Sequence, residues 1–219
     1  MLTHIDTIEI TPKSSHKYSI IWLHGLGADG HYFEGIVPAL RLTAHDHIHF
    51  IFPNAPIQAV TINGGVKMRA WYDIVEKTLE QEVDVNGIHE SAHLINHLIN
   101  QEIEKGISAD HILLAGFSQG GVIALHTGLN INQNLAGIVA LSTYFPTINE
   151  LDSTPNSTPI FIAHGILDSI VDIESGKAVF NTLQAANHPI EWHDYLMEHS
   201  VCPEEIKDIA AFINKTFND

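Results

Sequence analysis

The sequence predicts an α/β protein with a mostly parallel sheet, in which all 219 residues (1–219) form a single domain. Short apolar runs alternate along the chain with longer patterns of helical period, which is typical of parallel strands connected by helices. Two runs, Ile112–Phe117 and Pro159–His164, are apolar nearly throughout, as expected of central strands covered on both faces. The length suits one domain with a substantial core, and no repeat or linker divides it.

Six strands and four helices are predicted in alternation, and Thr7–Thr11 is expected to add an edge strand. The six strands are Tyr18–Leu23, Ile48–Pro53, Ile112–Phe117, Gly137–Ser142, Pro159–His164 and Pro189–Tyr195. The helices are roughly Gly87–Lys105, Gln119–Leu129, Ile173–Ala186 and Pro203–Thr216. The last helix begins with Pro203, Glu204 and Glu205, because proline and acidic side chains are favourable in a first helical turn.

The segment from Pro53 to about Asn86 breaks this alternation, since it has neither a clear helical period nor a long strand. A connection of that length is usually functional or contains small elements of its own. We expect it to line an apolar groove for substrate; the alternative is a loop that packs its own apolar residues. The candidate groove residues are Ile57, Val60, Ile62, Met68 and Trp71.

Charge and composition exclude several classes of protein. The formal charge of −16, from 26 acidic and 10 basic residues, repels nucleic acids and anionic lipid headgroups, so neither is an expected partner. No apolar run is long enough for a signal peptide or a membrane span, so we expect no stable membrane insertion and a cytoplasmic location. Cys202 is the only cysteine, so no internal disulfide is expected.

The strongest chemical motif is G-x-S-x-G, formed by Gly116, Ser118 and Gly120 at the end of a predicted strand and the start of a predicted helix. In this context the serine lies on a sharp turn that exposes its hydroxyl at the carboxyl edge of the sheet. We therefore expect Ser118 to be a nucleophile, with the Gln119 amide donating to an oxyanion. The alternative is a glycine-rich turn without chemistry. The motif and its position indicate the α/β-hydrolase fold.

A serine nucleophile needs a general base, and chain order selects one among 16 histidines. In α/β-hydrolases the order is serine, acid, histidine, which leaves His188, His193 and His199. His199 follows the last predicted strand and precedes the last helix, so it should lie at the carboxyl edge of the sheet with Ser118. The alternative is a solvated loop histidine.

The acid is expected to be Asp168, which follows the strand Pro159–His164 on a loop at the same edge. Asp172 stands close to a helix start, where N-capping explains it more simply. Glu150 and Asp152 follow the preceding strand and remain less favoured candidates.

A glycine-rich stretch, His24–Gly30, follows the strand Tyr18–Leu23 and is where a second oxyanion amide is expected. A phosphate-binding loop is the competing interpretation, but the lysine of that motif is absent. The glycines also fit the spacing of a dinucleotide-binding fingerprint. However, Asp46, near the position where its acidic residue is expected, lies before its strand rather than after it.

With these residues together, the chain resembles the acyl-protein thioesterase/carboxylesterase family of α/β-hydrolases, also called phospholipase/carboxylesterase, and most of all its bacterial carboxylesterases. The similarity extends from Tyr18 to the last helix. The matching motifs, in order, are Leu23–Gly30, Met68–Asp73, Gly116–Gly121, Leu141-Ser142, His164-Gly165 with Asp168, and His199-Ser200.

The resemblance implies a catalytic triad of Ser118, Asp168 and His199, with the backbone amides of Leu26 and Gln119 forming the oxyanion hole. It implies hydrolysis of small-molecule or lipid acyl esters or thioesters, including those on acylated proteins, without metal or organic cofactor. Lysophospholipase activity at the same site is an alternative. The segment 53–73 would line the acyl site, and a homodimer is possible because family members often dimerise.

Two positions depart from the family pattern. Glu198 stands where the family usually has glycine before the triad histidine, so a negative charge is expected beside the proposed base. The stretch Ile170–Asp172 lacks the proline that is common there. Neither departure removes a catalytic group.

Two rival functions come from other classes. One is a non-catalytic α/β-hydrolase used as a binding module, which the complete set of chemical groups disfavours. The other is metal-dependent hydrolysis, because histidines recur at strand and helix spacing; the alternative is that they are solvated, and we expect no metal. These histidines are His45, His47 and His49, and then His89, His93 and His97.

Overall fold

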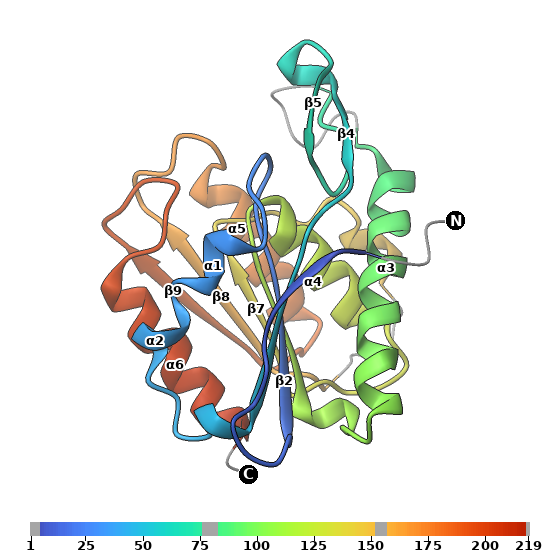
Figure 1. Cartoon of the computed structure of the whole chain (residues 1–219). Helices are drawn as coiled ribbons and strands as arrows, with labels where there is room; N and C mark the ends of the chain where they lie inside the picture. The colour runs from blue at the N-terminus through green and yellow to red at the C-terminus, as the bar shows by residue number, and fades with distance from the viewer. Residues whose placement is uncertain (1–4, 76–82, 152–156, 218–219) are drawn as a thin grey trace.

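The computed structural model describes residues 5–75, 83–151 and 157–217 and confirms the predicted α/β fold (Figure 1). A seven-stranded sheet has the order β1-β3-β2-β6-β7-β8-β9, and only the edge strand β1 is antiparallel. The strands are β1 (Thr7–Ile10), β2 (Tyr18–Leu23), β3 (Ile48–Pro53), β6 (Ile112–Phe117), β7 (Gly137–Leu141), β8 (Ile160–Gly165) and β9 (Ile190–Tyr195). All seven were predicted, with ends that differ by one residue at most.

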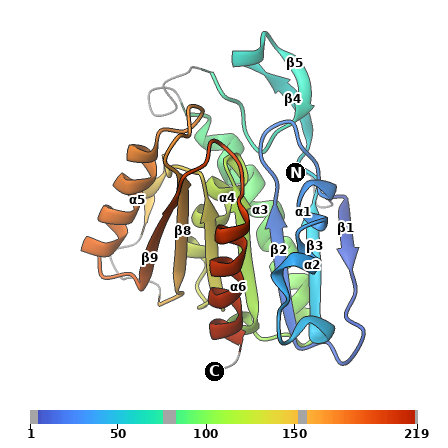
Figure 2. The same ribbon diagram turned by 90° about the vertical axis from the view of Figure 1, so that its left-hand side faces the viewer.

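Helices cover both faces of the sheet (Figure 2). The longer ones are α3 (Val85–Glu104), α4 (Gln119–Asn130), α5 (Ile173–Ala185) and α6 (Pro203–Phe217), and two short ones are α1 (His31–Glu34) and α2 (Val37–Leu40). Helix α3 begins two residues before the predicted Gly87, because Asp84 accepts the Gly87 amide as its N-cap. Further short 3₁₀ turns occupy His45–His47, Thr61–Asn63, Ala109–His111 and Ile148–Glu150.

Two separate apolar cores lie on the two faces of the sheet. Along β2, Ile21 and Leu23 pack with α3, α4 and α5, whereas Ile20 and Trp22 pack with α1, α2 and α6. This division follows from the alternation of side chains along a strand. Both sets are fully buried, which is why the predicted strands are continuously apolar rather than alternating.

The segment that breaks the alternation contains a small antiparallel hairpin that the sequence analysis did not predict. Strands β4 (Ile57–Val60) and β5 (Val66–Arg69) pair outside the main sheet and project from the molecule beyond the carboxyl ends of its strands (Figure 1). Each strand has only four residues and one exposed face. Such short strands carry too few residues for a periodic signal.

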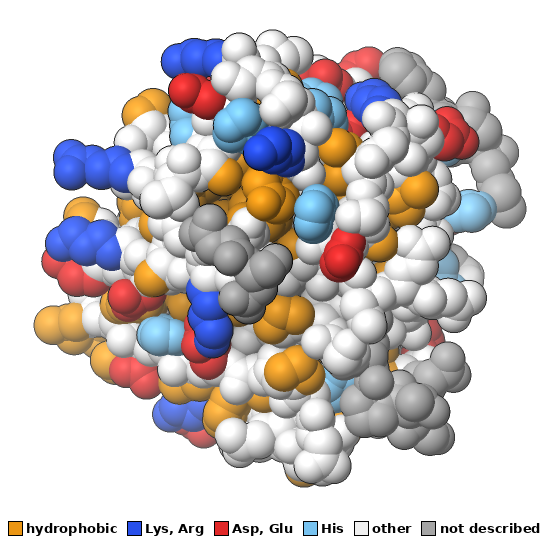
Figure 3. All heavy atoms as spheres, turned by 90° about the horizontal axis from the view of Figure 1, so that it is seen from below, with side chains coloured by type: hydrophobic (Ala, Val, Ile, Leu, Met, Phe, Trp, Pro, Cys, Tyr) orange, Lys and Arg blue, Asp and Glu red, His pale blue; other side chains and the backbone are white. Residues whose placement is uncertain are grey.

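Because all strands but β1 are parallel, their carboxyl ends share one edge of the sheet and their amino ends share the other. The loops that follow β2, β6, β8 and β9 all leave from the carboxyl edge, where open α/β sheets bind ligands. The opposite face has a hollow of about 380 Å³ between the end of α6 and the loops before β6, β7 and β8. Figure 3 shows this face, with hydrophobic side chains gathered near its centre.

Among the described residues, no helix is both long enough and apolar enough to span a membrane.

Glu205, in the first turn of α6, is fully buried. Within the described part of the chain, neither carboxylate oxygen has a hydrogen-bond partner. Burial raises its pKa from 4.5 to about 8; the nearby Cys202 amide offsets this in part, and the Asp208 charge adds to it. The folded protein therefore holds a proton that the unfolded chain releases at neutral pH.

Replacing Glu205 with glutamine should raise the free energy of unfolding at pH 8.5 by about 1–3 kcal/mol. The pKa of Glu205 is higher in the folded protein than in the unfolded chain. The stability that protonated Glu205 contributes to the wild type is therefore fully present below pH 4.5 and is lost as pH rises towards 8. The variant should therefore gain much less at pH 4.5. Urea unfolding at both pH values, with the exposed neighbour Glu204→Gln as control, measures the difference. A gain that is equal at both pH values would contradict this account.

Candidate active site

Ser118 occupies the sharp turn between β6 and α4, in a backbone conformation of φ 53° and ψ −121° that non-glycine residues rarely adopt. The two glycines of the motif make this turn possible. A Cβ at Gly116 would lie 2.2 Å from the Gly120 carbonyl oxygen, and one at Gly120 would lie 2.6 Å from the carbonyl oxygens of Leu23 and His24. Only glycine fits at either position.

The turn is held by hydrogen bonds from the neighbouring strand. The Ser118 amide donates to the Leu141 carbonyl at 2.8 Å, and the Thr143 hydroxyl donates to the Ser118 carbonyl at 2.7 Å. Both partners belong to β7 or the residues directly after it. These contacts maintain the strained backbone and fix the direction of the serine side chain.

His199 and Asp168 meet at the same edge of the sheet. Nδ1 of His199 lies 2.7 Å from Oδ2 of Asp168, which is fully buried, whereas the His199 side chain is 17% exposed. The other oxygen, Oδ1, accepts the amides of Ile170 and Val171, each at 2.9 Å. The carboxylate is thus held from both sides and leaves one oxygen for the imidazole.

These contacts keep Asp168 ionised. Burial acts to raise its pKa, but the His199 hydrogen bond and the Val171 and Ile170 amides outweigh burial and hold the pKa below 3.8. His164 lies beneath, fully buried, with Nε2 3.6 Å from Asp168 Oδ2 and 2.9 Å from the Val171 carbonyl oxygen. Burial lowers the pKa of His164, which disfavours a second positive charge beside the carboxylate.

Ser118 and His199 both line one cavity of about 650 Å³. Leu26 and Gln119 line it as well. Among the described residues, neither of their backbone amides has a hydrogen-bond acceptor, so both are available to a substrate oxygen. The structure therefore brings together all five residues that the sequence analysis assigned to chemistry.

Of the five candidate groove residues, only Ile62 lines this cavity. Val60 is buried, and the Met68 sulfur accepts a hydrogen bond from Asn63. Ile57 and Trp71 border a separate hollow against α3. Within the hairpin, Val60 and Met68 lie on one face and Ile57 lies on the other, so the pairing of β4 with β5 separates these side chains.

Trp71 lies next to the serine turn and forms two hydrogen bonds there. Its amide donates to Oε1 of Gln119, and its indole donates to the His24 carbonyl, both at 2.8 Å. The side-chain amide nitrogen of Gln119, Nε2, in turn donates to the Tyr72 carbonyl at 2.7 Å. The motif residue Gln119 therefore joins the segment after the hairpin to the start of α4.

The cavity lining also includes large side chains that the sequence analysis did not name individually as groove residues: Tyr32, Tyr72, Ile74, Phe117, Tyr144, Ile170 and Val171. The hydroxyl groups of Tyr72 and Tyr144 form a hydrogen bond of 2.7 Å. Phe117 and Tyr144 could have been found, because each lies at or just beyond the carboxyl end of a strand. Tyr32 lies in the short helix α1, and the remaining residues lie on loops whose path the sequence pattern does not show.

The less favoured acids and bases lie elsewhere. Asp172 caps α5 by accepting the Glu174 amide, as predicted. Glu150 pairs with His89 at 2.7 Å, and Asp152 lies outside the described residues. The ring of His193 stacks on Phe161, and His188 is buried. The side chain of Glu198 is exposed, and its carbonyl accepts the Ser200 amide.

The histidines at regular spacing do not assemble as sets. His45 contacts Phe50, His47 bonds Ser15, and His49 faces Glu102. On α3, His89 approaches His126, whereas His97 contacts Gln101. The periodic sets therefore divide among different neighbours, and none reaches the cavity at Ser118.

Comparison with known proteins agrees with this geometry. A sequence model of the family described as Phospholipase/Carboxylesterase matches residues 6–217. The chain is 35% identical to acyl-protein thioesterase 1 of Yarrowia lipolytica, over 97% of both chains. It is 36% identical to acyl-protein thioesterase 1 of Saccharomyces cerevisiae, over 92% of this chain and 94% of the relative.

The crystal structure of Arabidopsis thaliana SOBER1 superimposes with a TM-score of 0.85 at 30% identity, covering 91% of this chain and 99% of the other. Similar sequence and similar fold thus extend over nearly the whole length of both partners. The chain belongs to the phospholipase/carboxylesterase family of α/β-hydrolases and is a hydrolase.

Proposed function

We propose that this protein hydrolyses acyl esters and thioesters, with Ser118 as nucleophile, His199 as general base and Asp168 as the group that orients His199. The observation that carries the proposal is the serine turn, which opens into the same cavity as an imidazole held at 2.7 Å by a buried carboxylate. Relatives named acyl-protein thioesterase support this chemistry.

In the proposed reaction, His199 takes the Ser118 proton as the hydroxyl oxygen attacks the acyl carbonyl carbon. The Leu26 and Gln119 amides donate to the oxyanion that forms. His199 then protonates the leaving alcohol or thiol, and the acyl group remains on Ser118. Water, activated by the same imidazole, attacks the acyl-enzyme and releases the carboxylic acid. Asp168 stays ionised and stabilises the imidazolium at each step.

The cavity favours an acyl chain as the recognised part of the substrate. Its lining is mostly apolar and aromatic, with Tyr32, Ile62, Ile74 and Ile170 around the opening of the serine turn. No lysine or arginine belongs to the described lining, so no permanently charged side chain there would pair with a phosphate group. We therefore favour small-molecule or lipid acyl esters and thioesters, including those on acylated proteins, over lysophospholipids.

A fluorophosphonate probe tests the proposal directly. We expect it to label the wild-type protein and not Ser118→Ala, because phosphonylation needs the activated hydroxyl. Matched oxygen and sulfur esters of increasing acyl length would then rank the substrates by kcat/KM. Absence of labelling in natively folded wild type would instead support a non-catalytic binding module.

The reaction as written uses only groups of the chain and water, so we propose that no cofactor is required. Activity unchanged by dialysis against EDTA is the expected result. We also propose that the enzyme is cytoplasmic. We further propose that it forms a homodimer, and light scattering would test this oligomeric state.

A further inference from the structure

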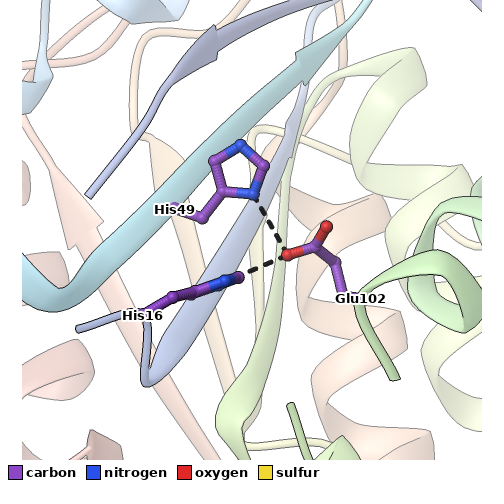
Figure 4. A group of neighbouring side chains, drawn as sticks. All are labelled: His16, His49 and Glu102. Carbon is purple, nitrogen blue, oxygen red and sulfur yellow. Dashed lines mark hydrogen bonds and ion pairs between the residues drawn. The ribbon is translucent and has the colours of Figure 1, made fainter. Parts of the chain in front are cut away.

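Two histidines and a glutamate converge at the amino-terminal ends of the strands, at the opposite edge of the sheet from Ser118 (Figure 4). His16 precedes β2, His49 belongs to β3 and Glu102 lies in the last turn of α3. Glu102 Oε2 is 3.1 Å from His49 Nδ1 and 3.4 Å from His16 Nε2. All three atoms lie within 4.8 Å of one another.

These separations suit one metal ion. A tetrahedral ion with bonds of about 2.0–2.1 Å places its ligand atoms roughly 3.3–3.4 Å apart. The two contacts of Glu102 Oε2 with the histidines differ from this by at most a few tenths of an ångström. Two imidazoles and one carboxylate form a donor set that zinc binds well, whereas Mg²⁺ and Ca²⁺ prefer oxygen alone.

Each deeper ligand is also oriented by a second contact. His49 Nε2 lies 3.1 Å from Glu9 Oε2, which is the carboxylate–histidine arrangement found behind metal-binding imidazoles. Glu102 accepts Lys105 on Oε1 and Ser19 on Oε2, each at 2.6 Å. The side chains of Glu102 and His49 are only 1% and 4% exposed, so they are held in place before any ion arrives.

His49 lies between two carboxylates, and this position calls for a cation. A neutral imidazole that donates Nε2–H to Glu9 presents the lone pair of Nδ1 to Glu102, which is repulsive at 3.1 Å. Either a second proton on the ring or a metal ion between Nδ1 and Oε2 removes the repulsion. The ion would also engage His16, and in doing so would replace the contact of 2.9 Å between His16 Nε2 and the Ser19 hydroxyl.

We propose that His16, His49 and Glu102 bind one Zn²⁺ ion, with water as the fourth ligand on the side where His16 reaches solvent. The ion would join the loop before β2, strand β3 and the end of α3, and so stabilise the amino-terminal half of the sheet. It takes no part in ester hydrolysis, because the site is a full strand length from the serine turn.

A second histidine cluster provides a matched control. His89, His126 and Glu150 also gather within 4.8 Å, but two of the three are exposed and His126 Nδ1 bonds the Thr147 hydroxyl. Because its residues are less buried, we expect this cluster to bind more weakly. His16→Ala and His89→Ala each remove one imidazole from one cluster.

The test is titration of tag-free, EDTA-dialysed protein with Zn²⁺ at pH 7.5, followed by calorimetry. We expect one tight site in wild type, a Kd at least about 10-fold higher in His16→Ala, and an unchanged tight site in His89→Ala. Glu9→Gln should raise Kd about 10–100-fold by releasing His49. Circular dichroism confirms that each variant is folded.

A second measurement keeps the inference testable if a variant is unstable. Zn²⁺ at about 100 times Kd should raise the wild-type Tm by roughly 5–10 °C and leave ester hydrolysis unchanged. Absence of zinc binding by wild type, equal affinity in His16→Ala, or loss of the tight site in His89→Ala would each overturn the proposal.

Discussion

Replacement of Ser118 by alanine should lower kcat/KM for a short p-nitrophenyl ester by at least about 10³-fold. The proposed acyl-enzyme forms on the Ser118 oxygen, so no covalent intermediate can form without it. The variant should retain its fold, because alanine and serine have the same backbone preferences at this turn. The contacts with Leu141 and Thr143 also involve only the backbone of residue 118. Substrate binding should change little, since the cavity gains only the volume of one oxygen.

Steady-state kinetics of wild type, Ser118→Ala and the exposed-serine control Ser14→Ala measure this effect. The control lies before β2 at the other end of the sheet and should match wild type. Wild-type activity in correctly folded Ser118→Ala would show that another residue is the nucleophile.

Replacement of Asp168 by asparagine should lower kcat by about 10³–10⁴-fold. The surrounding contacts determine the orientation of the asparagine side-chain amide. Oδ1 of Asp168 accepts the Ile170 and Val171 amides, so the carbonyl oxygen of asparagine has to occupy that place. Its NH₂ group then faces His199 Nδ1, where Asp168 Oδ2 was at 2.7 Å. The imidazole must accept there, so its proton moves to Nε2 and it can no longer take the serine proton.

The neighbour Asp172 offers a matched control for this substitution. It caps α5 through the Glu174 amide, and asparagine caps helices as well as aspartate does. Asp172→Asn should therefore keep its activity within about 2-fold and its Tm nearly unchanged. A loss smaller than 10-fold in Asp168→Asn would argue that Asp168 does not set the orientation of His199.

The sequence sufficed for features that depend on neighbours in the chain. Strands β6 and β8 were predicted because burial on both faces requires continuous apolar residues, and the serine turn was predicted because its glycines lie two residues from Ser118. Chain order also selected Asp168 and His199, since successive parallel strands end at one edge of the sheet. The structure places these two side chains in contact.

Tertiary structure alone decided which side chains from distant segments of the chain meet. The cavity joins Tyr32, Ile74 and Ile170, and no periodic pattern links residues so far apart. The hairpin β4–β5 divided Ile57, Val60 and Met68 between its two faces, and none of the three lines the cavity at Ser118. The regularly spaced His45, His47 and His49 point to no common site; instead, His49 meets Glu102, which is 53 residues away. Sequence patterns record local sterics and burial, whereas contacts between distant residues depend on how the helices and strands pack.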